Sequence, residues 1–220
     1  MTSKPVLIIG NKNYSSWSLR PWLALRHFEV EFDEIRLPLG TSQFNDDIYR
    51  YSPSGKVPAL VHGDLYIWDS LAILEYANET LLAGKGWPNT VTARATARAI
   101  SAEMHSGFTE LRANLPMNCR KRLKNFPISA AVEKDVNRIC EIWNVTRKKF
   151  GSNGPYLLGE FSTADAMYAP VVLRFTSYAV TIPKEAQQYC DAILALPAMK
   201  SWLAEAALET EVISKYERDI

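Results

Sequence analysis

The spacing of apolar residues changes near residue 84, and no other feature of the chain constrains the fold more. Before this point, short apolar runs typical of strands alternate with stretches that repeat at the helical period. After it, only helical stretches follow. Residues 84–89 read Gly-Lys-Gly-Trp-Pro-Asn, a composition typical of a linker. The chain is therefore expected to contain a mixed α/β domain at 1–83, a linker at 84–89 and an all-helical domain at 90–220.

The first domain is expected to follow the order strand, helix, strand, helix, hairpin, helix. Asp69 precedes the last of these helices and is a suitable N-cap, because its side chain can accept hydrogen bonds from free backbone amides. The expected elements are a strand at 6–9, a helix at 17–28, a strand at 30–37, a helical or irregular segment at 42–51, a loop at 52–58, a hairpin at 59–68 and a helix from 70.

The second domain is expected to be a helical bundle. Residues 162–165, Ser-Thr-Ala-Asp, match a capping box in which Asp takes the place of the usual Glu or Gln. The expected helices cover residues 90–115, 129–150, 163–178 and 197–207.

Composition limits the partners and the compartment. The 220 residues carry a formal net charge of +1, so we expect neither a nucleic-acid partner nor a membrane surface. The apolar runs are far shorter than the ~20 residues of a membrane-spanning helix, and the start of the chain is too brief for a signal peptide. The three cysteines, Cys119, Cys140 and Cys190, are widely spaced and odd in number, which favours free thiols and a cytoplasmic location.

Several chemistries lack their motifs. The chain has no glycine-rich phosphate loop and no Gly-x-Ser-x-Gly motif, and its histidines and cysteines do not have metal-ligand spacing. We therefore expect no metal. The first 118 residues contain no cysteine, and dithiol chemistry would need one at the start of the first helix. That position holds Ser15 and Ser16, which by themselves indicate only a helix N-cap.

Four motifs in order give this serine pair a second interpretation. They are residues 15–20 (Ser-Ser-Trp-Ser-Leu-Arg), 52–60 (Ser-Pro-Ser-Gly-Lys-Val-Pro-Ala-Leu), 69–76 (Asp-Ser-Leu-Ala-Ile-Leu-Glu-Tyr) and the 162–165 capping box. Together they resemble the serine-type glutathione transferases of the zeta class and related bacterial enzymes. The resemblance implies a thioredoxin-like N-terminal domain, a C-terminal helical bundle, glutathione as co-substrate and a homodimer.

The resemblance also implies how the thiol of glutathione is activated. A serine hydroxyl would donate to the thiolate, with Ser15 as the first choice, Ser16 as the second and Tyr14 as a rival. Lowering a thiol pKa of about 8.5 by about two units requires about 2.7 kcal/mol. A hydrogen bond to a charged acceptor supplies about 1.5–3 kcal/mol, and a helix N-terminus adds about 0.3–1 kcal/mol. These two effects suffice without a metal or a histidine base.

The remaining glutathione contacts follow from the same resemblance. Pro58 would be a cis proline, and the backbone of Val57 would pair with the cysteinyl part of the tripeptide. Asp69 and Ser70 would bind the γ-glutamyl end, and Lys56 would pair with the glycine carboxylate.

The electrophile site is expected between the serine loop and the first helix of the second domain. On one continuous helix, His105 shares a face with Phe108 and Arg112, whereas Glu103 shares one with Ser106. The candidate residues for this site are Tyr14, His105, Phe108, Arg112 and Arg174.

Three functions stay open. The first is conjugation of glutathione to an electrophilic small molecule, and the second is isomerisation of the maleylacetoacetate kind. In that isomerase class an arginine of the helix after the capping box binds substrate; here its position is Ser177, with Arg174 one turn earlier. The cysteine that usually follows the serine pair is Trp17, and both departures weigh against isomerisation. The third function is a non-catalytic module in assembly or regulation.

Overall fold

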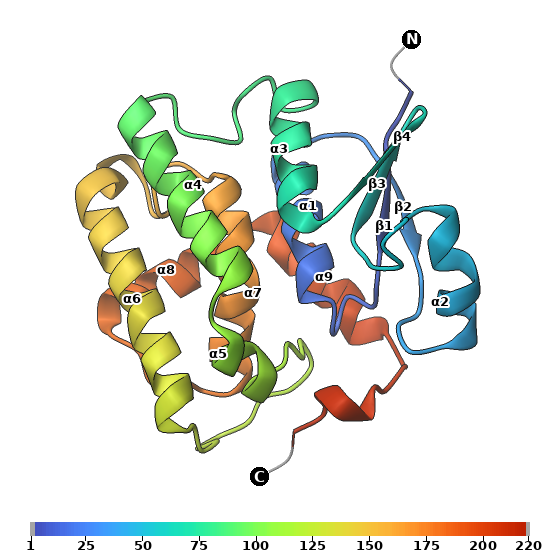
Figure 1. Ribbon diagram of the computed structural model, residues 1–220. Helices are drawn as coiled ribbons and strands as arrows, with labels where there is room; N and C mark the ends of the chain where they lie inside the picture. The colour runs from blue at the N-terminus through green and yellow to red at the C-terminus, as the bar shows by residue number, and fades with distance from the viewer. Residues whose placement is uncertain (1–2, 219–220) are drawn as a thin grey trace.

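The computed structural model describes residues 3–218 and places a small sheet with its helices beside a helical bundle (Figure 1). The strands are β1 (Val6–Ile9), β2 (Asp33–Arg36), β3 (Ala59–His62) and β4 (Leu65–Trp68). The helices are α1 (Ser16–His27), α2 (Ser42–Asp47), α3 (Ser70–Thr80), α4 (Val91–Ser106), α5 (Thr109–Asn114), α6 (Ala130–Phe150), α7 (Thr163–Ser177), α8 (Lys184–Ala195) and α9 (Pro197–Leu208), with 3₁₀ turns at Ile48–Arg50, Gly151–Asn153 and Ser214–Tyr216.

The sheet has the strand order β2-β1-β3-β4. β1 is parallel to β2 and antiparallel to β3, and β3 and β4 form an antiparallel hairpin. Successive residues of a strand point to opposite faces. Accordingly Leu7 and Ile9 face the main core, whereas Ile8 packs with Leu37 and Ile48 in a smaller cluster on the other face. The predicted element order and the thioredoxin-like first part are confirmed.

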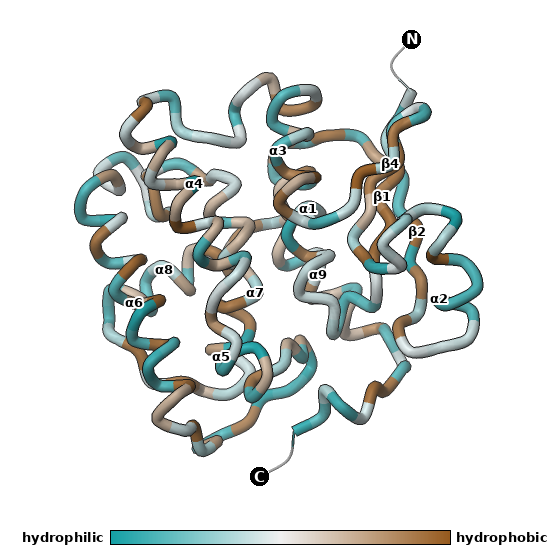
Figure 2. The backbone as a smooth tube through the Cα atoms, viewed as in Figure 1, coloured by the Kyte–Doolittle hydropathy of each residue, from teal (hydrophilic) through white to brown (hydrophobic). Residues whose placement is uncertain are grey.

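One hydrophobic core joins the two parts of the molecule. It includes Trp22 of α1 together with Trp143 of α6 and Trp202 of α9, all essentially buried. The rings of Trp22 and Trp202 meet edge to face at 5.1 Å. In Figure 2 hydrophobic stretches of the backbone occur in both parts of the molecule, on β1 and along α6 and α7. The boundaries at residues 83 and 90 stay a prediction, because the apolar packing continues across them.

The predicted helix at 90–115 was wrong as a single element. α4 ends at its C-cap residue, Gly107. Only a residue without a Cβ fits there, because a Cβ would lie 2.8 Å from the carbonyl oxygen of Glu103. The next residue, Phe108, adopts a left-handed conformation with φ 59°. The chain then starts again as α5 in a new direction. The second strand is shorter than predicted, and α8 was not predicted, although Ala186, Tyr189 and Ile193 have helical spacing.

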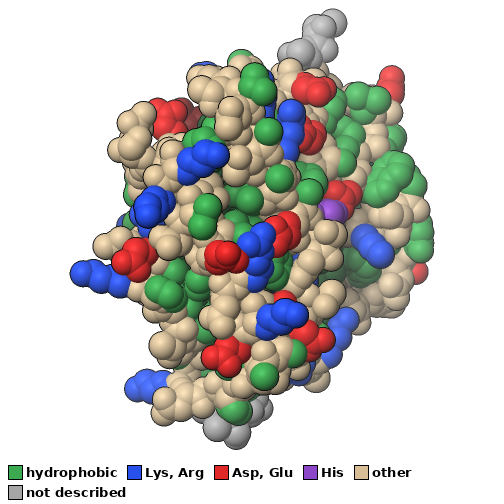
Figure 3. All heavy atoms as spheres, turned by 60° about the vertical axis from the view of Figure 1, so that its left-hand side comes forward, with side chains coloured by type: hydrophobic (Ala, Val, Ile, Leu, Met, Phe, Trp, Pro, Cys, Tyr) green, Lys and Arg blue, Asp and Glu red, His purple; other side chains and the backbone are tan. Residues whose placement is uncertain are grey.

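The surface has no dominant charge on the side shown in Figure 3, where Lys and Arg side chains are interspersed with Asp and Glu. Within residues 3–218, no helix combines the length and apolar character that crossing a membrane requires.

Candidate functional site

Ser15 is the N-cap residue of α1, but its side chain does not cap the helix. It is 6% exposed, and its Oγ lies 2.7 Å from Oγ of Ser18. The fully buried Ser18 Oγ also accepts a hydrogen bond from the Gly10 amide at 3.1 Å. The Ser15 hydroxyl donates to Ser18 in this structure, and because a hydroxyl rotates to suit its partners, it can turn its hydrogen toward a ligand instead. The predicted N-cap position is confirmed at Ser15, but its side chain makes no capping hydrogen bond.

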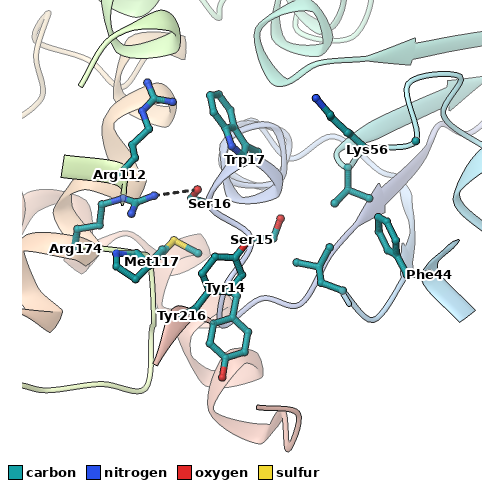
Figure 4. Close-up of a pocket in the computed structure, with 14 residues that line it drawn as sticks. Tyr14, Ser15, Ser16, Trp17, Phe44, Lys56, Arg112, Met117, Arg174 and Tyr216 are labelled. Atoms are coloured by element: carbon teal, nitrogen blue, oxygen red, sulfur yellow. Dashed lines mark hydrogen bonds between the residues drawn. The ribbon is translucent and has the colours of Figure 1, made fainter. Parts of the chain in front are cut away.

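Ser16 has a charged partner. Its Oγ accepts a hydrogen bond from Nη2 of Arg174 at 3.2 Å, the contact drawn as a dashed line in Figure 4. The guanidinium of Arg174 also donates to the carbonyl of Leu115. Burial, together with the nearby Arg112 guanidinium, lowers the pKa of Arg174 to about 10. Among the described residues, no carboxylate pairs with Arg174, so a fully buried cation faces this loop without a counter-ion.

An open cavity of about 390 Å³ begins at the two serines. Arg112 and Arg174 come to it from the helical part, Lys56 and Phe44 come from the opposite side, and Trp17 lies between (Figure 4). The other lining residues are Tyr14, Leu39, Gly55, Val57, Pro116, Met117 and Tyr216.

A second cavity of about 440 Å³ adjoins the first, because Trp17, Lys56 and Val57 line both. It also contains Ser54, Pro58, Trp68, Asp69 and Ser70, so the predicted glutathione-binding residues other than the serine pair meet here. The Val57–Pro58 peptide bond is cis, as the resemblance implied.

Asp69 is the N-cap of α3, as predicted. Its Oδ1 accepts hydrogen bonds from the amides of Leu71 at 2.9 Å and Ala72 at 3.3 Å. Asp69 has φ 77°, a conformation that non-glycine residues rarely adopt. The next residue, Ser70, is buried, and its hydroxyl accepts a hydrogen bond from Arg20 at 3.3 Å.

Tyr14 lines the first cavity with its ring, while its hydroxyl is engaged elsewhere. That hydroxyl donates to the carboxylate of Glu217 at 2.7 Å and accepts from Arg120 at 3.0 Å and from the amide of Ile213 at 3.3 Å. These bonds tie the residues after α9 to the serine loop. They also leave the Tyr14 hydroxyl poorly suited to stabilise a thiolate.

The three residues expected on one face of the first helix of the bundle separate at the break after α4. Arg112 reaches the first cavity and donates to the carbonyls of Met104, His105 and Gly107, which closes the end of α4. Phe108 is 8% exposed and belongs to the core, and His105 contacts Asp69. Neither His105 nor Phe108 lines the first cavity, because the expected shared face needed an unbroken helix.

Sequence reasoning missed part of this cavity. Pro116 and Met117 follow α5, and Tyr216 lies beyond α9, in segments without a periodic pattern that would have pointed to a site. Within residues 3–218, no group of three or more His, Cys, Asp or Glu residues has an arrangement suited to a metal ion.

Comparisons with known proteins agree on one family. A family model described as "Glutathione S-transferase, N-terminal domain" matches residues 14–80. Maleylacetoacetate isomerase of Rattus norvegicus is 32% identical over 182 residues, which cover 81% of this chain and 82% of that protein. Glutathione S-transferase Z1 of Arabidopsis thaliana is 40% identical over 74 residues, 31% of this chain and 33% of that one.

Solved structures show the same fold. A glutathione transferase homologue from Burkholderia gl BGR1, solved with bound glutathione, has a TM-score of 0.70 at 18% identity. The match covers 93% of this chain and 98% of that one.

Proposed function

The chain belongs to the glutathione transferase family of enzymes, with zeta-like relatives, and we propose that Ser15 activates the thiol of bound glutathione for attack on an electrophilic small molecule. One observation carries the assignment of Ser15. Its hydroxyl stands at the N-terminus of α1, beside the cavities, and makes no helix-cap bond. A hydroxyl placed there, whose oxygen accepts no backbone amide, can turn its hydrogen from Ser18 to an anion.

The energetics support a neutral donor. A hydrogen bond from Ser15 to a thiolate contributes about 1.5–3 kcal/mol, and the α1 N-terminus contributes about 0.3–1 kcal/mol. When the Ser15 hydroxyl turns to the thiolate, Ser18 can donate to the Ser15 oxygen while it accepts from the Gly10 amide, and hydrogen bonds in such a chain strengthen one another. This is enough to lower a thiol pKa by about two units.

We place glutathione in the second cavity, with its thiol directed to Ser15. Val57 offers its backbone to the cysteinyl part, and Lys56 lies within the same cavity for the glycine carboxylate. The buried Ser70 at the start of α3 suits the γ-glutamyl carboxylate, and the Asp69 carboxylate suits its ammonium group.

We place the electrophile in the first cavity. Arg174 is buried there without a carboxylate partner among the described residues, so an electrophile that carries an anionic group would complete the site. The same observation favours a second candidate, glutathione-dependent isomerisation of a carboxylate-bearing substrate. One relative in the comparison is named maleylacetoacetate isomerase. Ser177 donates to the carbonyl of Asn118 at 2.7 Å, so Arg174 would have to take its place in that reaction.

We also propose a homodimer and a cytoplasmic location. Tyr66 and Trp68, on the edge strand β4, are 49% and 46% exposed, which suits a contact with a second copy. Cys119, Cys140 and Cys190 are free thiols, which suits a reducing compartment. A monomeric mass by light scattering at micromolar concentration would contradict the dimer.

The decisive experiment measures binding and thiol ionisation together. Reduced glutathione is titrated by calorimetry into the wild type and Ser15→Ala, with Ser16→Ala and Tyr14→Phe as matched controls, and thiolate absorbance is followed against pH. We expect the wild type to bind glutathione with a lowered thiol pKa, and Ser15→Ala to raise that pKa by about one to two units.

Each other outcome has a distinct meaning. No binding to the wild type would refute the transferase proposal, and binding with an ordinary thiol pKa would favour the non-catalytic module. An unchanged thiol pKa in Ser15→Ala would move the role to the control variant that does raise it.

A further inference from the structure

His105 belongs to the last turn of α4 in the helical part, yet its side chain reaches the N-terminus of α3. Its Nε2 lies 3.1 Å from Oδ2 of Asp69. We propose that His105 is a positioning residue for glutathione, which holds the Asp69 carboxylate in place for the γ-glutamyl ammonium group. This inference rests on the proposed function. It means that a residue of the helical part helps to bind glutathione.

The two carboxylate oxygens of Asp69 are held separately. Oδ1 accepts the amides of Leu71 and Ala72 at the start of α3, and Oδ2 faces His105. With φ 77°, the Asp69 backbone is in a sparsely populated region that persists only where surrounding contacts enforce it. The imidazole restrains the oxygen that the helix amides leave free.

The imidazole can do this without adding charge. Within the described part of the chain, Nδ1 of His105 is buried and has no hydrogen-bond partner. A protonated ring would place an N–H there with no acceptor, so the neutral tautomer with hydrogen on Nε2 fits the surroundings. Burial, with Arg20 and Arg112 nearby, lowers the pKa of His105, while Asp69 opposes this. The neutral imidazole therefore adds no positive charge that would compete with a cationic ligand group for Asp69.

Packing fixes the orientation of the ring. The edge of Trp17 meets His105 with ring centroids 5.3 Å apart and an interplanar angle of 73°. Trp17 is itself held by the guanidinium groups of Arg20 at 4.2 Å and Arg112 at 4.9 Å. His105 thus contacts Asp69, which lines the glutathione cavity, and Trp17, which lines both cavities.

The test compares two ligands on the same variants. Calorimetry measures the dissociation constants of glutathione and of glutaryl-cysteinyl-glycine, which keeps the carboxylate but lacks the γ-glutamyl amino group. His105→Ala removes the donor, and His105→Gln keeps an N–H close to the position of Nε2. His62→Ala is the matched control, since His62 bonds Tyr76 at 2.8 Å and lines neither cavity.

We expect His105→Ala to weaken glutathione binding about five- to tenfold and to change the affinity for the amine-free analogue less than twofold. We expect His105→Gln and His62→Ala to keep the wild-type ratio. Equal weakening of both ligands, an unchanged ratio in His105→Ala or no rescue by His105→Gln would overturn the inference. A wild type that does not bind glutathione would instead contradict the proposed function.

Discussion

Replacing Arg174 by Met should leave the fold at least as stable as the wild type while it damages the electrophile site. Burial lowers the pKa of Arg174 from its usual value to about 10, so the folded chain holds this proton about 3 kcal/mol less favourably than the unfolded chain does. Met removes that cost and keeps an apolar side chain of similar length. The change leaves the Leu115 carbonyl without this donor, which costs about 1–3 kcal/mol, whereas Ser16 is only half-buried and can bind water.

The net expectation for Arg174→Met at pH 7 is a change in unfolding free energy between about zero and 2 kcal/mol in favour of the variant. Urea denaturation followed by tryptophan fluorescence measures it, with the slope against denaturant checked for two-state behaviour. Arg138→Met is the control, because Arg138 is an exposed partner of Glu103 and Glu141 and should change stability by less than ~1 kcal/mol.

Activity supplies the second half of this test. Turnover of a carboxylate-bearing electrophile should fall at least ~100-fold in Arg174→Met, since the anion loses its buried partner. Turnover of a neutral electrophile should fall much less. A loss of stability of ~2 kcal/mol or more, with both electrophiles affected alike, would refute the reasoning and make Arg174 a structural residue.

Three further predictions use other contacts. Ser18→Ala should raise the pKa of the bound glutathione thiol, measured by thiolate absorbance, by less than Ser15→Ala does, because it removes the hydroxyl that supports Ser15 and not the donor itself. Gly107→Ala should destabilise the fold by about 1–3 kcal/mol in urea, since the new Cβ would meet a backbone carbonyl oxygen at 2.8 Å. The affinity for S-methylglutathione, which has no thiol to titrate, should be constant above pH 6.5 and fall below it. Burial lowers the pKa of His105, so its imidazolium forms only at acidic pH, where it competes with the ligand ammonium group for Asp69. His105→Gln should lose this part of the pH dependence.

Sequence patterns correctly predicted those helix ends that depend only on residues close by in the sequence. The N-cap at Asp69 forms with the expected bonds, and in the capping box the Asp165 carboxylate accepts the Ser162 amide at 2.8 Å, as expected. The break after α4 was missed because it depends on the left-handed backbone of Phe108 as well as on Gly107, and helical periodicity continues through both.

In the candidate site, too, the residues next to element boundaries were predictable from the sequence, and the contacts between distant segments were not. Ser15, Val57 and Ser70 stand next to element boundaries that the sequence marks, so their approach to one end of the sheet could be foreseen. The contacts of Arg174 with Ser16 and of His105 with Asp69 join segments far apart in the chain. Such contacts depend on how α7 and α4 pack against the first part, which periodicity does not specify.

Arg174 and Asp69 are each held at a cost in stability, and their positions suit the charges of a ligand pair. Arg174 is a buried cation without a carboxylate partner among residues 3–218, and Asp69 is held in a strained backbone conformation. The buried charge and the strained backbone each lower the stability of the fold, and neither is needed to pack the core. They flank Trp17 on different sides, one at each cavity. An anionic ligand group near Arg174 would offset the cost of its buried charge, and a cationic group would pair with the carboxylate that the strained backbone of Asp69 presents, with the thiol between them at Ser15. The two charges therefore assign the two ligands to different cavities. Arg174→Met should weaken recognition of the anionic electrophile, whereas His105→Ala should weaken binding of the γ-glutamyl ammonium group.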